Sequence, residues 1–82
     1  MATRVVFLGE LGARFGRDHV LIGDDGLTLR DVRRLLIDQV EGCGPHISQP
    51  NVRLMVDQVI VPEDTRVGPD QEVAVLPIYS GG

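Results

Sequence analysis

The stretch TLRDVRRLLIDQVE, residues 28–41, decides the fold because it is the clearest helix in the chain. Its apolar residues recur every three or four positions on one face, which predicts an amphipathic helix of about four turns. Thr28 is a candidate N-cap, and Asp31 completes a variant of the capping box. Gly42 marks the expected stop. The apolar face comprises Leu29, Val32, Leu36 and Val40 with Leu35 beside it, and the solvated face comprises Arg30, Arg33, Arg34, Asp38 and Glu41.

Short strands are expected on both sides of this helix. Segments rich in β-branched and apolar residues, bounded by glycine, proline or acidic turns, are typical of strands. Residues 9–16, GELGARFG, predict one or two helical turns, whereas residues 43–50 and 62–70 predict loops. The predicted strands are Thr3–Leu8, His19–Ile22, a hairpin over Arg53–Val61 with its turn at Asp57–Gln58, and Gln71–Pro77. The order predicts an α+β domain, a mixed sheet of about five strands packed on one main helix.

Both faces of this predicted sheet are apolar. Side chains alternate along a strand, so Val5 and Phe7 share one face while Val6 and Leu8 share the other. The last strand repeats the pattern, with Ala74 and Leu76 on the second face. One long helix covers only one side of a small sheet. The second face is therefore either an exposed binding patch or is covered by residues 9–16 and the loops.

The end of the sequence, PIYSGG, suggests a working tail. Pro77 cannot donate a ladder hydrogen bond, so we expect a domain over residues 1–77 and a flexible tail over residues 78–82. Extended, such a tail reaches roughly 16 Å. Gly81 and Gly82 would make it narrow, and an ionised carboxylate on Gly82 could attack the α-phosphate of ATP.

Composition narrows the remaining function classes. The net charge is −4 and the arginines are scattered, which argues against nucleic-acid binding. No apolar run approaches the length of a membrane span or a signal peptide, so a soluble, cytoplasmic protein is expected without membrane partners. All eight basic residues are arginine. Cys43 is interpreted as a small loop residue, since His46 gives only a weak hint of a reactive thiol. Neither His46 nor His19 has cysteine partners, so no metal site is expected.

Several stretches resemble the small subunit of molybdopterin synthase, a ubiquitin-like sulfur carrier that ends in Gly-Gly. The stretch GPDQEVAVLPIYSGG resembles that family's C-terminus, an acidic turn followed by an apolar strand, a proline and the two glycines. VVFLGELGARFG resembles its first strand and short helix, and TLRDVRRLL the start of its main helix. VDQVIV resembles its hairpin, with Asp57 in place of the more usual asparagine. The resemblance implies a β-grasp fold whose first and last strands are parallel and central.

The same resemblance implies a sulfur-transfer cycle. An E1-like enzyme that uses ATP would adenylate Gly82, and a sulfur donor would convert it to a transient thiocarboxylate. The tail, comprising Ile78, Tyr79, Ser80 and Gly81, would enter the large subunit of a heterotetrameric synthase and deliver sulfur to cyclic pyranopterin monophosphate. Catalytic groups would lie in the partner, so no permanently bound cofactor and no activity of the chain alone are expected. The partner-facing patch would comprise Leu8 and Leu76, with Val6 and Ala74 on the same face.

Three other functions stay open. The chain could carry sulfur for another pathway, such as thiazole, cysteine or a thio-natural product. It could be a ubiquitin-like modifier conjugated through Gly82, although without lysine it cannot form lysine-linked polymers of itself. It could also be a plain interaction module, which ranks last. Ile78 and Tyr79 stand where a second proline and a small residue are commoner in the family, so we expect partner specificity at these positions.

Overall fold

The computed structural model describes residues 2–78 and contains five strands and three helices in that range. The predicted strands and both predicted helices are present, with boundaries shifted by one or two residues. In chain order the elements are β1 (Ala2–Phe7), α1 (Glu10–Phe15), β2 (Asp18–Ile22), α2 (Leu29–Gln39), α3 (Gly44–Ile47), β3 (Val52–Val56), β4 (Val59–Ile60) and β5 (Glu72–Pro77).

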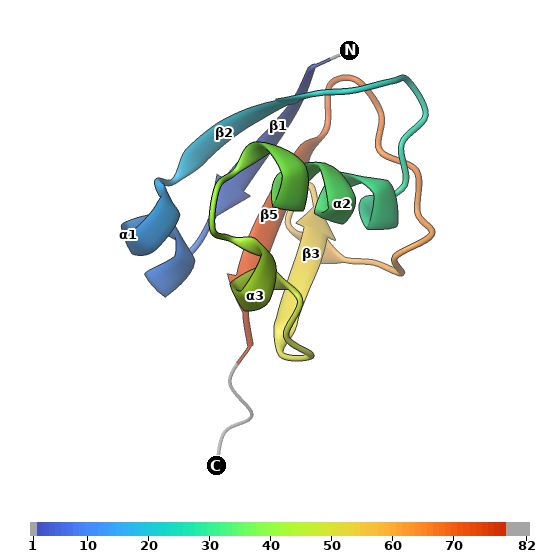
Figure 1. Ribbon diagram of the computed structural model, residues 1–82. Coiled ribbons are helices and arrows are strands. Elements are labelled where there is room, and N and C mark those ends of the chain that lie inside the picture. The colour runs from blue at the N-terminus through green and yellow to red at the C-terminus, as the bar shows by residue number, and fades with distance from the viewer. Residues whose placement is uncertain (1, 79–82) are drawn as a thin grey trace.

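The five strands form one mixed sheet in the order β2-β1-β5-β3-β4. β1 and β5 are parallel and adjacent, with Val6 opposite Ala74, and all other pairs are antiparallel. Figure 1 shows β5 between β1 and β3, so the last strand runs through the middle of the sheet. The expected mixed sheet with central, parallel first and last strands is confirmed.

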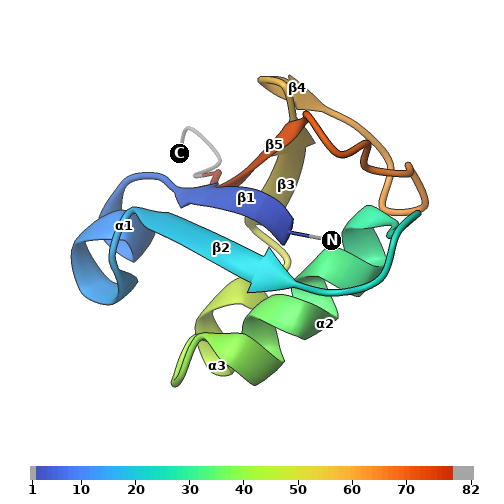
Figure 2. The ribbon, with the colours of Figure 1, turned by 90° about the horizontal axis from the view of Figure 1, so that it is seen from above.

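The hydrophobic core lies between the sheet and the helices. Figure 2 shows α2 and α3 together on one side of the sheet. The core residues of α2 are Leu29, Val32 and Leu36, none of which is exposed to solvent. They pack against the inward side chains of the strands, which include Val5, Phe7, Leu54, Val73 and Val75.

The helix α2 begins as predicted but ends early. Thr28 accepts a hydrogen bond from the Asp31 N–H, and the Asp31 carboxylate accepts one from the Thr28 N–H, which together form the predicted capping box. The helix spans 11 residues, about three turns instead of the predicted four. It stops because Val40 adopts an extended conformation, with φ −108° and ψ 104°.

The expected loop over residues 43–50 is wrong in its first half. Residues Gly44–Ile47 form the single-turn helix α3, with Pro45 in its first turn. Ile47 and Cys43 are both completely buried in the core, so two apolar side chains fix this turn against α2. Cys43 lies in the loop between α2 and α3, as the sequence indicated, but its side chain is part of the core.

Arg33 corrects the prediction that the basic face of the main helix is solvated. Its guanidinium forms a salt bridge with Glu63, with 3.0 Å between Nε and Oε1. It also donates hydrogen bonds to the carbonyl oxygens of Ile47 and Val52. One side chain therefore ties α2 to α3, to the start of β3 and to the loop after β4.

The predicted hairpin turn is confirmed at Asp57 and Gln58. Both residues have positive φ, 48° and 70°, as a two-residue turn between antiparallel strands requires. The Asp57 carboxylate accepts hydrogen bonds from the Glu72 N–H at 3.2 Å and from Gln71 Nε2 at 3.1 Å. These contacts hold the unfavourable turn against the start of β5.

Candidate functional site: the outer sheet face and the root of the tail

The face of the sheet opposite α2 and α3, called the outer face below, has no helix over it among residues 2–78 (Figure 2). The open question of whether residues 9–16 cover this face is answered by Leu11. This α1 side chain is buried and belongs to the core on the helix side. On the outer face, three large apolar side chains of the edge strands β2 and β4 are more than half exposed, namely Val20 (60%), Ile22 (65%) and Ile60 (52%). The outer face is therefore the apolar surface that the strand pattern predicted.

The four residues predicted as a partner-facing patch lie together on this face. Val6 and Ala74 are direct neighbours across the central parallel pair, and neither is part of the core cluster. The Leu8 N–H donates to the Val75 carbonyl oxygen at 2.9 Å, which continues the pairing beyond β1 and brings Leu8 to the level of Leu76. Leu8 and Leu76 are both half-buried. We call these four residues, Val6, Leu8, Ala74 and Leu76, the outer patch.

The predicted tail, residues 78–82, begins directly after β5. Pro77 is still paired with Val52, and the Ile78 N–H donates to the Asn51 carbonyl oxygen at 2.7 Å. The expectation that the chain extends freely from residue 78 is wrong at this residue, because a backbone hydrogen bond holds Ile78 to the residue before β3. The predicted tail residues Tyr79, Ser80, Gly81 and Gly82 lie outside the described residues.

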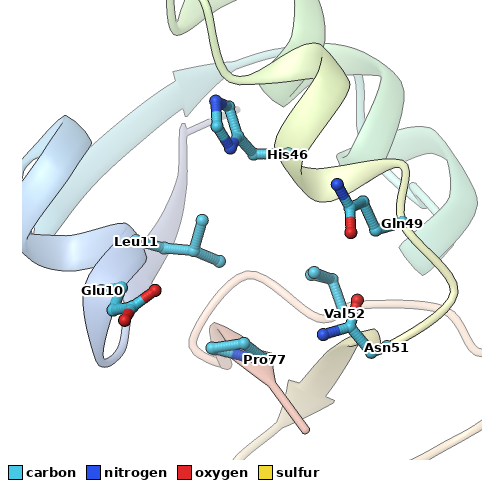
Figure 3. A pocket seen from close by; sticks show the side chains of 7 residues that line it. All are labelled: Glu10, Leu11, His46, Gln49, Asn51, Val52 and Pro77. Atoms are coloured by element: carbon cyan, nitrogen blue, oxygen red, sulfur yellow. The ribbon is translucent and has the colours of Figure 1, made fainter. Parts of the chain in front are cut away.

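A cavity of about 230 Å³ lies at this root of the tail, on the helix side of the sheet (Figure 3). Leu11, Val52 and Pro77 form its apolar part, and polar side chains stand around them. Typical small-molecule pockets measure about 300–1,000 Å³, so this cavity is below that range. The residues that line it are Glu10, Leu11, His46, Gln49, Asn51, Val52 and Pro77.

The two residues weighed as a reactive pair have other partners. The Cys43 thiol lies 3.2 Å from the Leu36 carbonyl oxygen as a donor, and burial raises the pKa of this thiol. His46 Nε2 lies 3.3 Å from Nη1 of Arg14, and its ring packs edge-on against Phe15. Since arginine can only donate, Nε2 of His46 is the acceptor in this contact. Neither group is arranged as a nucleophile or its base.

Other chemistry in the described residues would be indicated by a metal-binding cluster, a membrane-spanning helix or an acidic group with a shifted pKa. Among residues 2–78, no three His, Cys, Asp or Glu side chains gather in a way that could hold a metal ion. No helix in this range is both long enough and apolar enough to cross a membrane. Hydrogen bonds from the Thr28 backbone N–H and hydroxyl lower the pKa of the Asp31 carboxyl. These bonds cap α2, so the role of Asp31 is structural and not catalytic.

The sequence argument missed three residues of this site. Arg53 and Met55 lie on the outer face, because they alternate along β3 with the buried Val52, Leu54 and Val56. The alternation in RLMV was visible in the sequence, but only the register with β5 shows that Arg53 stands opposite Leu76. Asn51 was placed in a loop, so its contact with Ile78 carried no sequence signal.

Comparison with known protein families identifies the family to which this chain belongs. The ThiS family matches residues 5–82, which is nearly the whole chain. The chain belongs to the ThiS family of ubiquitin-like sulfur carriers. Among curated proteins, none matches the chain significantly.

Solved structures confirm the ubiquitin-like β-grasp fold of this ThiS-family chain. SAMP1 from Haloferax volcanii superposes with a TM-score of 0.76 at 16% identity, with 100% of each chain covered. A second structure of H. volcanii small archaeal modifier protein 1 has a TM-score of 0.74 at 13% identity, covering 95% of this chain and 98% of that one. A complex of subunits 1 and 2 of molybdopterin-converting factor from Helicobacter pylori 26695 contains a chain that matches with a TM-score of 0.71 at 18% identity, again over 100% of both. At these identities the likeness establishes the fold alone.

Proposed function

We propose that this ThiS-family chain is a sulfur carrier that acts as the small subunit of a molybdopterin synthase. The observation that carries the proposal is the position of β5 in the middle of the sheet. This central strand ends beside the outer patch, and the Ile78–Asn51 hydrogen bond fixes the point where the tail starts. The match to the ThiS family over residues 5–82 supports the sulfur-carrier part of the proposal.

The proposed chemistry takes place at the carboxylate of Gly82. In the first step, one carboxylate oxygen attacks the α-phosphorus of ATP on an E1-like enzyme, and pyrophosphate leaves. In the second step, hydrosulfide supplied by a sulfur donor attacks the acyl carbon. The acyl–oxygen bond to the adenylate breaks, AMP leaves with the attacking oxygen, and the product is a thiocarboxylate. Glycine suits this step because no Cβ crowds the acyl carbon.

The described residues would act by binding and positioning. The partner would cover the outer patch, in which Val6 and Ala74 are already buried in this structure. Burying its two half-exposed side chains, Leu8 and Leu76, would supply part of the binding energy. The hydrogen bond at Ile78 would fix the direction of tail entry, so that less conformational freedom is lost on insertion. The likeness to a chain in the two-subunit complex from H. pylori supports a large synthase subunit as this partner.

A second candidate function is protein modification through the same carboxylate. The likeness to two structures of an archaeal modifier protein supports it, because the modifier and the sulfur carrier share this fold. In that case the activated Gly82 would be passed to an amine of another protein. A sulfur carrier for a different acceptor pathway would use the same chemistry up to the thiocarboxylate.

Intact mass spectrometry tests the proposal. The protein is incubated with an E1-like enzyme from its own source, ATP and a sulfur donor. The expected product has one oxygen replaced by sulfur, and a variant that lacks Gly82 should remain unchanged while keeping its fold. Adding the large synthase subunit and cyclic pyranopterin monophosphate should return the original mass. An unchanged mass with an enzyme shown to be active on another carrier would contradict the proposal, and a covalent adduct with other proteins would favour modification.

A further inference from the structure

Arg53 is a cation surrounded by apolar neighbours at the root of the tail. It points to the outer face, because Val52 and Leu54 on either side of it are buried in the core. On β5 it stands directly opposite Leu76, and its diagonal neighbours on the same face are Ala74 and Ile78. Arg53 thus lies at the edge of the outer patch.

The charge of Arg53 is not balanced within the sheet. Its side chain is exposed, and among residues 2–78 it has no hydrogen bond or ion pair. Arg4, on the same face but farther from the tail, provides a contrast because it stands opposite Glu72 in the central pair. The row that lies nearest the tail, comprising Leu8, Leu76 and Arg53, therefore contains one cation and no acid.

This local charge is opposite in sign to that of the whole chain, which has a net charge of −4. A partner selected by overall charge would be basic, and a basic surface would repel Arg53 at the point of closest contact. A partner that closes over the row must therefore place a carboxylate against the guanidinium. Arginine suits such a contact, since its planar fork can hold both oxygens of one carboxylate.

We propose that Arg53 is a specificity-determining residue of the docking surface, and that its occupant is a protein surface with an apolar contact for Leu8 and Leu76 flanked by an aspartate or glutamate. This inference rests on the proposed function, because the occupant is the E1-like enzyme that would adenylate Gly82. Gly82 lies four residues beyond Ile78, a reach of up to about 14 Å. Arg53 thus acts at the entrance through which the tail passes and not on the reacting carboxylate.

The test measures activation kinetics with the E1-like enzyme from the same source, using ATP–pyrophosphate exchange at varied carrier concentration. The variants are Arg53→Glu, Arg53→Lys and the matched control Arg30→Glu, whose exposed side chain lies on α2, on the opposite side of the molecule. Arg53→Glu should raise the KM for the carrier at least tenfold with kcat unchanged. Arg53→Lys should raise it less, and Arg30→Glu should stay within about twofold of wild type. The wild-type KM should rise with salt, and this dependence should weaken in Arg53→Glu.

Each other outcome overturns the proposal in a distinguishable way. Wild-type protein that is activated with the same KM as Arg53→Glu would refute the docking role of Arg53 and leave the proposed function intact. Wild-type protein that is not activated at all would refute the proposed function together with this inference. Sedimentation that shows a wild-type dimer abolished in Arg53→Glu, with activation unaffected, would make a second copy of the chain the occupant. Thermal melts of all variants should match wild type, since Arg53 and Arg30 are both exposed.

Discussion

Two leucine-to-alanine substitutions, Leu36→Ala and Leu76→Ala, make the same chemical change on opposite faces of the sheet. Leu36 on α2 has no exposed surface and belongs to the core. Leu76 on β5 is half-buried, lies on the outer face and is absent from the core cluster. If the faces are assigned correctly, the first change should act on folding and the second on partner binding.

The expected magnitudes follow from burial. Truncating a fully buried leucine to alanine costs about 2 to 5 kcal/mol, whereas a half-buried leucine on an open face should lose about 1 kcal/mol. A domain of 82 residues has a free energy of unfolding of about 4 to 12 kcal/mol. Leu36→Ala therefore removes a large share of the stability, and Leu76→Ala leaves the domain folded.

Urea denaturation followed by circular dichroism measures the first effect, and titration of a large synthase subunit or E1-like enzyme measures the second. Leu76→Ala should weaken binding at least about fivefold, because a truncated central contact of an interface costs more than about 1 kcal/mol. Val75→Ala, a change at a fully buried neighbour on β5, serves as a milder core control if Leu36→Ala unfolds. Equal losses of stability in Leu36→Ala and Leu76→Ala, or unchanged binding by Leu76→Ala, would refute the assignment of the faces.

Three further predictions concern local features. Gln58→Gly should raise the stability by about 1 kcal/mol and the Tm by several degrees, because glycine adopts φ 70° without strain; a lower Tm would contradict this. Asp31→Asn should reduce the Tm above about pH 4, because the pKa of the Asp31 carboxyl is lowered from 3.8 in the folded protein. The stability that the carboxylate contributes is therefore complete above that value and is lost as the pH falls through the folded pKa. A difference in Tm between wild type and variant that persisted at the lowest pH would argue against a role of the carboxylate. Cys43 should react with a thiol reagent only as the protein unfolds in urea, and rapid reaction of the native protein would disprove its burial.

The sequence was informative where local chemistry determines structure. The capping box at Thr28 and Asp31 and the apolar period of α2 depend on residues a few positions apart, so both could be predicted. The alternation in β1 and β5 predicted two apolar faces, and one long helix implied that one of them would be open. The structure confirms this outer face and places all four predicted patch residues on it.

The missed features depend on contacts between distant parts of the chain. Arg33 resembles a solvated helix charge until the fold brings Glu63, which is 30 positions away, within reach. The helix α3 spans only four residues, which is too short for a period, and its buried Ile47 has meaning only against α2. The Ile78–Asn51 bond and the position of Arg53 depend on the register of β3 with β5, which no local pattern encodes.

The central claim is that Gly82 carries the sulfur, and fragmentation of one peptide tests it most directly. The last arginine is Arg66 and the chain has no lysine, so trypsin should release the segment 67–82 as one piece after the carrier has been incubated with an E1-like enzyme, ATP and a sulfur donor. Tandem mass spectrometry of this peptide should place the exchange of oxygen for sulfur on Gly82, with all fragments that lack this residue unchanged. Sulfur found on Cys43 instead, or a peptide that never gains sulfur with an active enzyme, would contradict the account.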